Sequence, residues 1–328
     1  MILRIFKSSY IAQILFLISL TLILWLPTFL KPNPIVFTSS NVFTDLIFEI
    51  ELLNNTVLSK IIGFLLLLTE AFILTFIFSK HQLTHRNSFL SGFLFVLFLS
   101  RTPNHLGLNP SLIALLLLLV SLYNMLESYK ASRPLNNLLS TSIIFSLSGF
   151  FVPAILYLFP IILLSQIIFQ SFSWRSIPIS LIGLFLPYLI LGFTFFWFDK
   201  LDVFIEILFK LLDNLIWKFK IPLTYEFIEL SVSIILLFLA SVFILPRIGS
   251  QVISIRKKTS FMYWFLGISI LISFFNANNL SREIVFIPFS AILGFYLIAV
   301  KRKFWADLFI SLVFLLIIFQ NYKILFSA

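Results

Sequence analysis

Apolar runs long enough to cross a bilayer recur from Tyr10 to Gln320, and charged residues lie almost only in the short gaps between them. A membrane helix needs about 20 mostly apolar residues, because its backbone N–H and C=O groups must be satisfied within the segment. The composition agrees, with 60% hydrophobic and 11% charged residues, whereas soluble domains have roughly 25% charged residues. The sequence therefore predicts a polytopic integral membrane protein.

The chain of 328 residues has room for about eleven crossings and no polar stretch large enough for a separate soluble domain. We expect an all-α transmembrane helix bundle that forms one membrane domain over residues 1–328. The third and fourth predicted spans are short, and the fifth and sixth meet at Gly149 and Pro153, so tilted, re-entrant or buried segments are expected among them. The predicted spans are 10–30, 57–79, 88–100, 111–126, 136–150, 153–171, 177–198, 227–245, 261–276, 284–300 and 304–320.

The distribution of cations predicts the orientation. With the N-terminus inside, fourteen Lys and Arg residues fall on inner loops and eight on outer segments, while Lys60 lies within a span. Cytoplasmic loops are enriched in Lys and Arg. No small-residue cleavage site follows the first apolar run, which indicates a retained span. We expect a multi-pass protein of the bacterial inner membrane with a cytoplasmic N-terminus. The net charge of +10 is spread over short loops, so nucleic acid is not an expected partner.

Two outer segments are longer than turns. In the first, Ser39 to Asn41 offer N-cap side chains for a short helix over 42–53. In the second, over 199–220, four charged residues share one helical face while apolar residues fill the rest. This pattern predicts amphipathic helices in the outer interface, with Trp217 at headgroup depth. The four charged residues of the second segment are Asp202, Glu206, Lys210 and Asp213.

Asp45 and Glu49 are candidate catalytic residues of the first outer segment. They stand four residues apart, so both carboxylates would lie on one face of a helix and repel each other. A general base facing a substrate, or a pair of carboxylates holding a divalent cation, would explain that repulsion. The alternative is a solvated acidic face. No metal site is assigned.

Glu70 lies near the middle of the second span, where a charge is costly unless it is neutralised, paired or facing a polar cavity. Lys60 is about 15 Å away along the helix and cannot be its partner in that helix. We interpret Glu70 as a candidate substrate-binding residue. The alternative is a neutral carboxyl that donates a hydrogen bond to a neighbouring span.

The outer connection that begins at Arg101 and contains His105 supplies two further candidate substrate-binding residues. Arginine offers a bidentate fork to a phosphate or carboxylate. The alternative is a capped turn between two short helices. His81 and His85 stand in a basic loop with no acidic residue nearby in the sequence, which indicates a plain cytoplasmic loop and not a metal site.

Several kinds of chemistry have no support in the sequence. The chain has no cysteine, which excludes disulfides, thiolate metal sites and a Cys nucleophile. Gly-rich phosphate loops, zinc-protease helices and nucleophile elbows are also missing. The sequence does not identify a cofactor.

Three motifs carry a resemblance that runs through roughly the first 200 residues. They are Trp25-Leu26-Pro27 at the end of the first span, Glu70-Ala71-Phe72-Ile73-Leu74 in the second, and Ser173-Trp174-Arg175 followed by Gly183 and Pro187. On these residues the chain resembles an uncharacterised family of multi-pass inner-membrane proteins from Bacteroidota.

The layout of a first span, an outer segment with interfacial helices and then paired short spans is also similar to glycosyltransferases that use lipid-phosphate-linked sugars. Those enzymes usually carry an acidic residue directly after the first span, whereas the first acid in this chain is Asp45. The likeness implies a lipid-linked sugar as substrate.

Three functions follow from this sequence. The first is a glycosyltransferase-like protein acting on lipid-linked envelope precursors. The second is a non-catalytic membrane subunit or scaffold of an envelope-assembly system, with another envelope protein as partner. The third is a transporter or lipid flippase with Glu70 as its coupling group. Matching interruptions in two halves, typical of transporters, are not evident.

Overall fold

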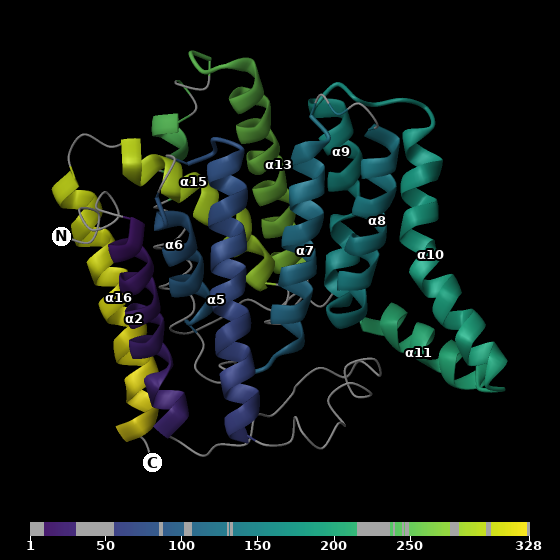
Figure 1. The fold of residues 1–328 in the computed structure, drawn as a ribbon, viewed down its shortest axis with the longest axis horizontal. Coiled ribbons are helices and arrows are strands. Elements are labelled where there is room, and N and C mark those ends of the chain that lie inside the picture. The colour runs from purple at the N-terminus through teal and green to yellow at the C-terminus, as the bar shows by residue number, and fades with distance from the viewer. Residues whose placement is uncertain are drawn as a thin grey trace.

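The protein folds as a bundle of helices (Figure 1), seen in a computed structural model. All regular structure in the described part of the chain is helical. The structure describes residues 10–30, 56–84, 88–101, 107–129, 131, 134–214, 237–238, 240–244, 246, 249–275, 282–299 and 303–326.

Most helix boundaries follow the predicted apolar segments, but α13 begins eight residues before the predicted 261, and most of the predicted span 227–245 lies outside the described residues. Four helices, α2, α5, α7 and α10, are long and apolar enough to cross a membrane. Among the described residues no other helix meets both conditions, so the total of about eleven spans stays a prediction. The helices are α2 (Tyr10–Leu30), α5 (Thr56–Lys80), α6 (Leu90–Leu99), α7 (Pro110–Glu127), α8 (Pro134–Phe151), η2 (Pro153–Leu158), α9 (Pro160–Ile168), α10 (Ser176–Trp197), α11 (Leu201–Asn214), α13 (Ile253–Phe275), η3 (Glu283–Val285), α15 (Phe286–Ala299) and α16 (Lys303–Phe326).

Three helices end in the same left-handed turn. Gln82, Gln170 and Asp199 have φ angles of 57°, 60° and 53°. After α5, Gln82 N–H donates to Ser79 O and Leu83 N–H donates to Phe78 O, which is the bonding pattern of a Schellman motif. This turn sets the position of His81, which lies between the last residue of α5 and the left-handed Gln82.

The junction between α8 and α9 is broken, as Gly149 and Pro153 predicted. The chain passes through the short 3-10 helix η2 before α9 begins at Pro160. A Cβ at Gly149 would lie 2.6 Å from Leu156 Cδ2, so the absence of a side chain there lets Leu156 of η2 pack closely against α8. The predicted span 153–171 is therefore a 3-10 turn followed by a nine-residue helix.

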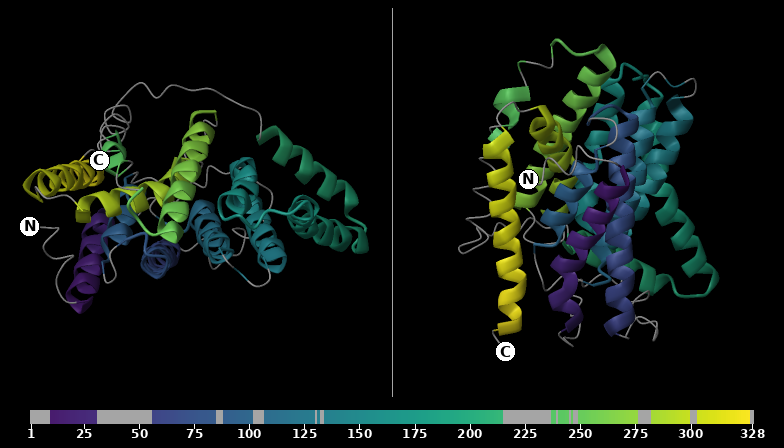
Figure 2. Two further views of the ribbon diagram at one scale, coloured as in Figure 1. Left: turned by 90° about the horizontal axis from the view of Figure 1, so that it is seen from above. Right: turned by 60° about the vertical axis from the view of Figure 1, so that its left-hand side comes forward.

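The bundle is elongated, with α2 and α16 at one edge and α10 and α11 at the other (Figure 2). The ends of α2, α10 and α16 and the start of α5 lie at the lower end in Figure 1, and the start of α13 lies at the upper end. Between the edges, α5, α6, α7 and α15 build a continuous apolar core.

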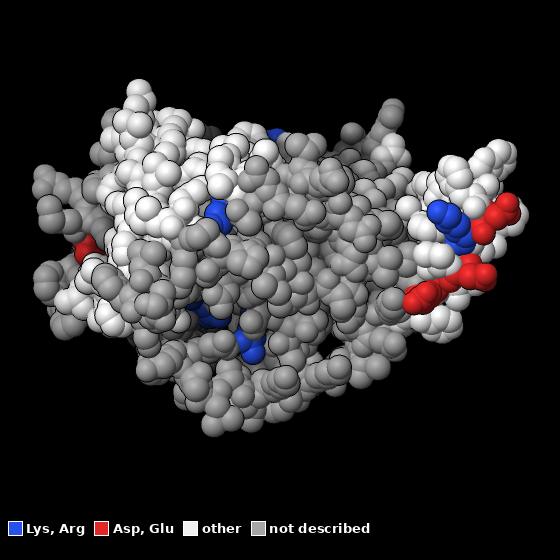
Figure 3. Space-filling view, turned by 90° about the horizontal axis from the view of Figure 1, so that it is seen from below, with Lys and Arg blue, Asp and Glu red and all other residues white. Residues whose placement is uncertain are grey.

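Helix α11 turns back against α10 at the lower end of the bundle (Figure 1). Its Phe204 packs on Gly192, where a Cβ would lie 2.9 Å from Phe204 Cε1. Acidic and basic side chains gather at this edge (Figure 3), and Asp202 and Glu206 are exposed. The amphipathic helix predicted over 199–220 is present as α11, while 215–220, including Trp217, and the predicted helix 42–53 lie outside the described residues.

Candidate functional site

Two short helices meet inside the bundle. Helices α6 and α15 have 10 and 14 residues, which correspond to about 15 and 21 Å, less than the roughly 30 Å of a hydrocarbon core. They pack antiparallel: the ring of Phe98 stacks on Phe286 with centroids 5.6 Å apart, and Ser91 lies against Gly294. The last turn of α6 therefore meets the first turn of α15 among the other helices (Figure 1).

Four polar residues gather where these helix ends meet. We call Glu70, Arg101, Ser111 and Glu283 the polar centre. The charge of Arg101 acts on the Glu283 carboxyl, and the Ser111 hydroxyl lies beside that carboxyl without forming a well-aligned hydrogen bond. The Arg101 guanidinium carbon lies 5.9 Å from the centroid of the Phe286 ring. The polar centre thus joins residues from α5, α7, η3 and the end of α6.

Glu70 is the most constrained member of the polar centre. Its side chain is completely buried, and neither carboxyl oxygen has a hydrogen-bond partner among the described residues. Glu283 is close enough for its charge to act on Glu70. A carboxylate in a dry interior costs several kcal/mol unless a proton, a cation or a hydrogen-bond donor compensates it. The Glu70 carboxyl therefore needs a proton or another compensating group.

Close packing of α5 on α6 holds Glu70 in the interior. Gly92 of α6 faces α5 so closely that a Cβ there would lie 2.8 Å from the carbonyl oxygen of Ala71. Ala71 itself is completely buried. Glu70 therefore stands next to the point where α5 and α6 pack most closely.

The helix ends add their own electrostatics. An α-helix carries a partial positive charge at its N-terminus and a partial negative charge at its C-terminus. Interrupted helices at membrane depth occur where the backbone is enclosed by protein or lines a cavity, and they form substrate and ion sites in transporters. The meeting of α6 and α15 beside two carboxyl groups has this general form.

The structure brings together two of the residues that the sequence singled out. The charge of Arg101 acts on the Glu283 carboxyl, and the charge of Glu283 in turn acts on Glu70. The predicted turn after Arg101 is also partly visible, since Asn109 caps α7 by accepting from Ser111 N–H. Asp45, Glu49 and His105 lie outside the described residues, so their roles stay predictions.

Glu283 was not singled out from the sequence. It is 7% exposed and one oxygen, Oε2, has no hydrogen-bond partner in the described part of the chain. An acid directly before an apolar run was the available signal, but it is also the common pattern of a loop residue at a membrane boundary. Only the antiparallel pairing of α15 with α6 moves Glu283 into the interior.

The interpretation of His81 as part of a plain basic loop is wrong. His81 is 5% exposed, Lys258 Nζ lies 2.8 Å from its Nδ1, and Glu127 Oε1 lies 3.8 Å from its Nε2. Glu127 is distant in sequence and reaches His81 because α5 and α7 end side by side. His85 lies outside the described residues.

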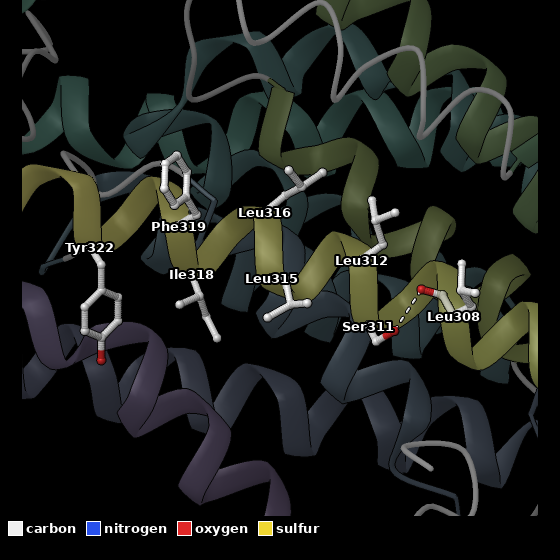
Figure 4. A pocket seen from close by; sticks show the side chains of 8 residues that line it. All are labelled: Leu308, Ser311, Leu312, Leu315, Leu316, Ile318, Phe319 and Tyr322. Carbon is white, nitrogen blue, oxygen red and sulfur yellow. Dashed lines mark hydrogen bonds between the residues drawn. The ribbon is translucent and has the colours of Figure 1, made fainter.

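An open groove of about 630 Å³ runs along α16 (Figure 4). Ser311 and Tyr322 are its two polar residues, and the Ser311 hydroxyl already donates to Leu308 O at 2.9 Å. The other side chains lining the groove are hydrocarbon or phenyl groups. The groove suits apolar chains and carries no acid or base for catalysis. Among the described residues no group of three potential metal ligands occurs either.

Comparison with protein-family models, with curated proteins and with solved structures gave no match for this chain. The described residues by themselves define the class: they are all helical in their regular structure, with four helices able to cross a membrane by length and composition and an enclosed polar centre.

Proposed function

We propose that this chain is a multi-pass protein of the bacterial inner membrane that acts, in the manner of a glycosyltransferase, on a lipid-linked envelope precursor. The observation that carries the proposal is the position of Arg101 beside Glu283 where α6 and α15 meet. A guanidinium next to a carboxylate supplies the two groups that transfer from a lipid-phosphate donor requires: a phosphate ligand and a base.

The chemistry assigns one role to each group. Arg101 binds the donor phosphate through its planar fork. Glu283 takes the proton from the acceptor hydroxyl, whose oxygen attacks the anomeric carbon of the sugar. The bond between that carbon and the phosphate oxygen breaks, and the polyprenyl phosphate leaves. Asp45 and Glu49 stay candidate bases, and His105 stays a candidate substrate-binding residue.

The arrangement of the helices supports an outer interface next to this site. Helix α11 lies at the end of the bundle where α2 ends and α5 begins (Figure 1). Lys80 and Lys258 lie at the opposite end and contact one polar cluster. We therefore propose about eleven spans, a cytoplasmic N-terminus and amphipathic helices on the outer face.

Binding of a polyprenyl phosphate by the purified full chain in nanodiscs tests the role of Arg101. Arg101→Lys should weaken binding about tenfold, because an ammonium cannot replace the bidentate fork. The exposed Arg175 provides the matched control, and Arg175→Lys should bind as the wild type does. Glu283→Gln should bind the lipid but fail to transfer sugar from a polyprenyl-phosphate donor. Unchanged binding by Arg101→Lys, or transfer by Glu283→Gln, would contradict the proposal.

A second candidate function is transport or lipid flipping, and Glu70 is the observation that favours it. Its carboxyl is enclosed with that of Glu283 and has no hydrogen-bond partner among the described residues. A group that binds and releases a proton as the bundle changes shape would have these surroundings. A third candidate, a non-catalytic scaffold that binds another envelope protein, needs no such group.

Glu70→Gln separates the candidates. A flippase requires that this variant lose movement of a fluorescent short-chain polyprenyl phosphate across proteoliposomes while its abundance stays normal. The transferase tolerates both Glu70→Gln and Glu70→Leu, because the Glu70 carboxyl has no hydrogen-bond partner among the described residues whose loss would cost stability. If the wild-type protein neither binds nor moves the lipid, the non-catalytic scaffold would be the remaining candidate function.

A further inference from the structure

A second polar cluster joins α5, α7 and α13, and the ends of α5 and α7 and the start of α13 lie at the upper end of the bundle in Figure 1. It is formed where α5 and α7 end and α13 begins. Lys80 Nζ lies 2.6 Å from Glu127 Oε1 and donates to Tyr123 Oη at 2.6 Å. On the other side, Lys258 Nζ donates to His81 Nδ1 at 2.8 Å. We call these five residues, together with Lys257 and Tyr129, the basic cluster.

The basic cluster has an excess of positive charge. Glu127 is the acid whose charge acts on Lys258 in the described part of the chain, and Glu127 already accepts from Lys80. Lys257 Nζ and Lys258 Nζ lie 5.6 and 5.7 Å from the ring centroid of Tyr129, so two ammonium groups lie near one aromatic ring. The basic cluster therefore contains three lysines and one carboxylate.

The imidazole of His81 lacks an acceptor. Because Nδ1 accepts from Lys258, the proton of the neutral ring stands on Nε2. That atom is buried and has no hydrogen-bond partner among the described residues, and Glu127 Oε1 at 3.8 Å is too far away. Burial, followed by the positive charge of Lys258, lowers the pKa of His81 to about 4. The ring is therefore neutral at physiological pH and cannot add to the positive charge.

We propose that the basic cluster binds a phosphate group, and that its place at the end of the bundle favours the headgroup of an anionic phospholipid over a free phosphate. The lysines supply charge-assisted donors, and the buried His81 Nε2–H beside them is a neutral donor without an acceptor among the described residues. Basic pockets between membrane helices bind such headgroups. The side chain of Lys80 is 42% exposed, so the cluster is accessible from the surface.

A cytoplasmic loop whose lysines only set the membrane topology would not need those lysines to contact buried side chains. Topology is set by the number of cations near a span, whatever their contacts. Here the cations converge from α5 and α13 on a buried imidazole and two tyrosines. This site does not depend on the proposed transfer at the polar centre, and it holds for either orientation of the chain.

The test uses the purified full chain in a neutral detergent and measures its melting temperature. Short-chain phosphatidylglycerol should raise the melting temperature by roughly 3 °C or more, and short-chain phosphatidylcholine should not. Lys258→Gln should weaken the response to phosphatidylglycerol about tenfold in concentration. Lys258→Arg, which keeps the charge, shows whether the altered response reflects loss of binding and not of folding.

Each control variant and each ligand in this test has a defined expected result. Arg175→Gln removes an exposed cation outside the cluster and should respond as the wild type does. Equal stabilisation by inorganic phosphate that is lost in Lys258→Gln would identify a soluble phosphate as the ligand. Equal responses to the two lipids, or equal losses in Lys258→Gln and Arg175→Gln, would overturn the site.

Discussion

Tyr322 Oη donates a hydrogen bond of 3.2 Å to the carbonyl oxygen of Ile23. That carbonyl stands four residues before Pro27, which has no N–H to donate to it. The neighbouring Asn321 donates from Nδ2 to Leu24 O at 3.2 Å and to Ser100 O at 3.0 Å. Helix α16 therefore supplies the hydrogen-bond donor that the Ile23 carbonyl lacks because of Pro27. These hydrogen bonds hold α16, near the end of the sequence, against α2, near its beginning.

Removal of this hydroxyl should destabilise the packing of α16 on α2. We expect Tyr322→Phe to lower the free energy of unfolding by about 1 kcal/mol, because the Ile23 carbonyl loses a donor that water cannot replace inside a membrane. Ser311→Ala is the control, since that hydroxyl bonds only within its own helix. Equal melting temperatures for Tyr322→Phe and the wild type would show that the carbonyl finds another partner.

Gly63→Ala should be among the most damaging small substitutions in the chain. A Cβ at Gly63 would lie 2.4 Å from the carbonyl carbon of Gly107, where the two backbones touch and Leu108 N–H donates to Ser59 O. Since backbone must move, we expect a loss of roughly 2–4 kcal/mol, seen as a lower melting temperature.

The matched control is Gly267→Ala. A Cβ at that position of α13 meets nothing within 4 Å. Alanine should therefore stabilise the helix by roughly 0.5–1 kcal/mol. If both substitutions had the same effect, the close approach at Gly63 would be refuted.

Acidification should weaken the fold through His81. Its pKa is about 4 in the folded chain, below the ordinary 6.5. Between these values the unfolded chain binds a proton that the folded chain does not, so stability falls as the pH drops from 6.5 towards 4. His81 should account for about 2 kcal/mol of the loss by pH 5.

Unfolding measured at pH 7.5 and pH 5 in wild type and His81→Asn tests this prediction. The Asn oxygen replaces Nδ1 as the acceptor for Lys258 but does not titrate. The variant should lose less stability than the wild type over this interval. A greater loss in the variant would mean that His81 is protonated in the folded state.

Helix α11 should lie parallel to the membrane surface. Its exposed acids follow one stripe, and apolar side chains such as Phe204 pack towards α10. Spin labels placed along 201–214 should show water accessibility with a period near four residues. Uniform burial of the labels would make α11 a core helix or a further span.

Reporter fusions check the orientation. Ser250 precedes α13 at the end of the bundle that holds the basic cluster, and an alkaline phosphatase fused there should be inactive because this end is expected in the cytoplasm. Fusions at Lys220 and Ala328 should be active. A periplasmic report from Ser250 would reverse the orientation, whereas a cytoplasmic report from Ala328 alone would change only the number of spans.

The sequence by itself determined the helices, because the length of an apolar run and the positions of proline are local properties. It therefore predicted the bounds of α2 and α5 within one residue, and the break at Pro153. It also identified Glu70 as anomalous, since a charge within an apolar run is costly wherever the helix lies.

Only the tertiary structure decided which polar groups meet. Glu283 stands more than two hundred residues after Glu70 and reaches it because α6 and α15 pair inside the bundle. Glu127 reaches His81 in the same way, through helices that end side by side. Neither pairing can be predicted from hydrophobic periodicity in the sequence, because a single buried polar side chain leaves the apolar pattern of its helix unchanged. Which residue becomes its partner depends on how the helices pack.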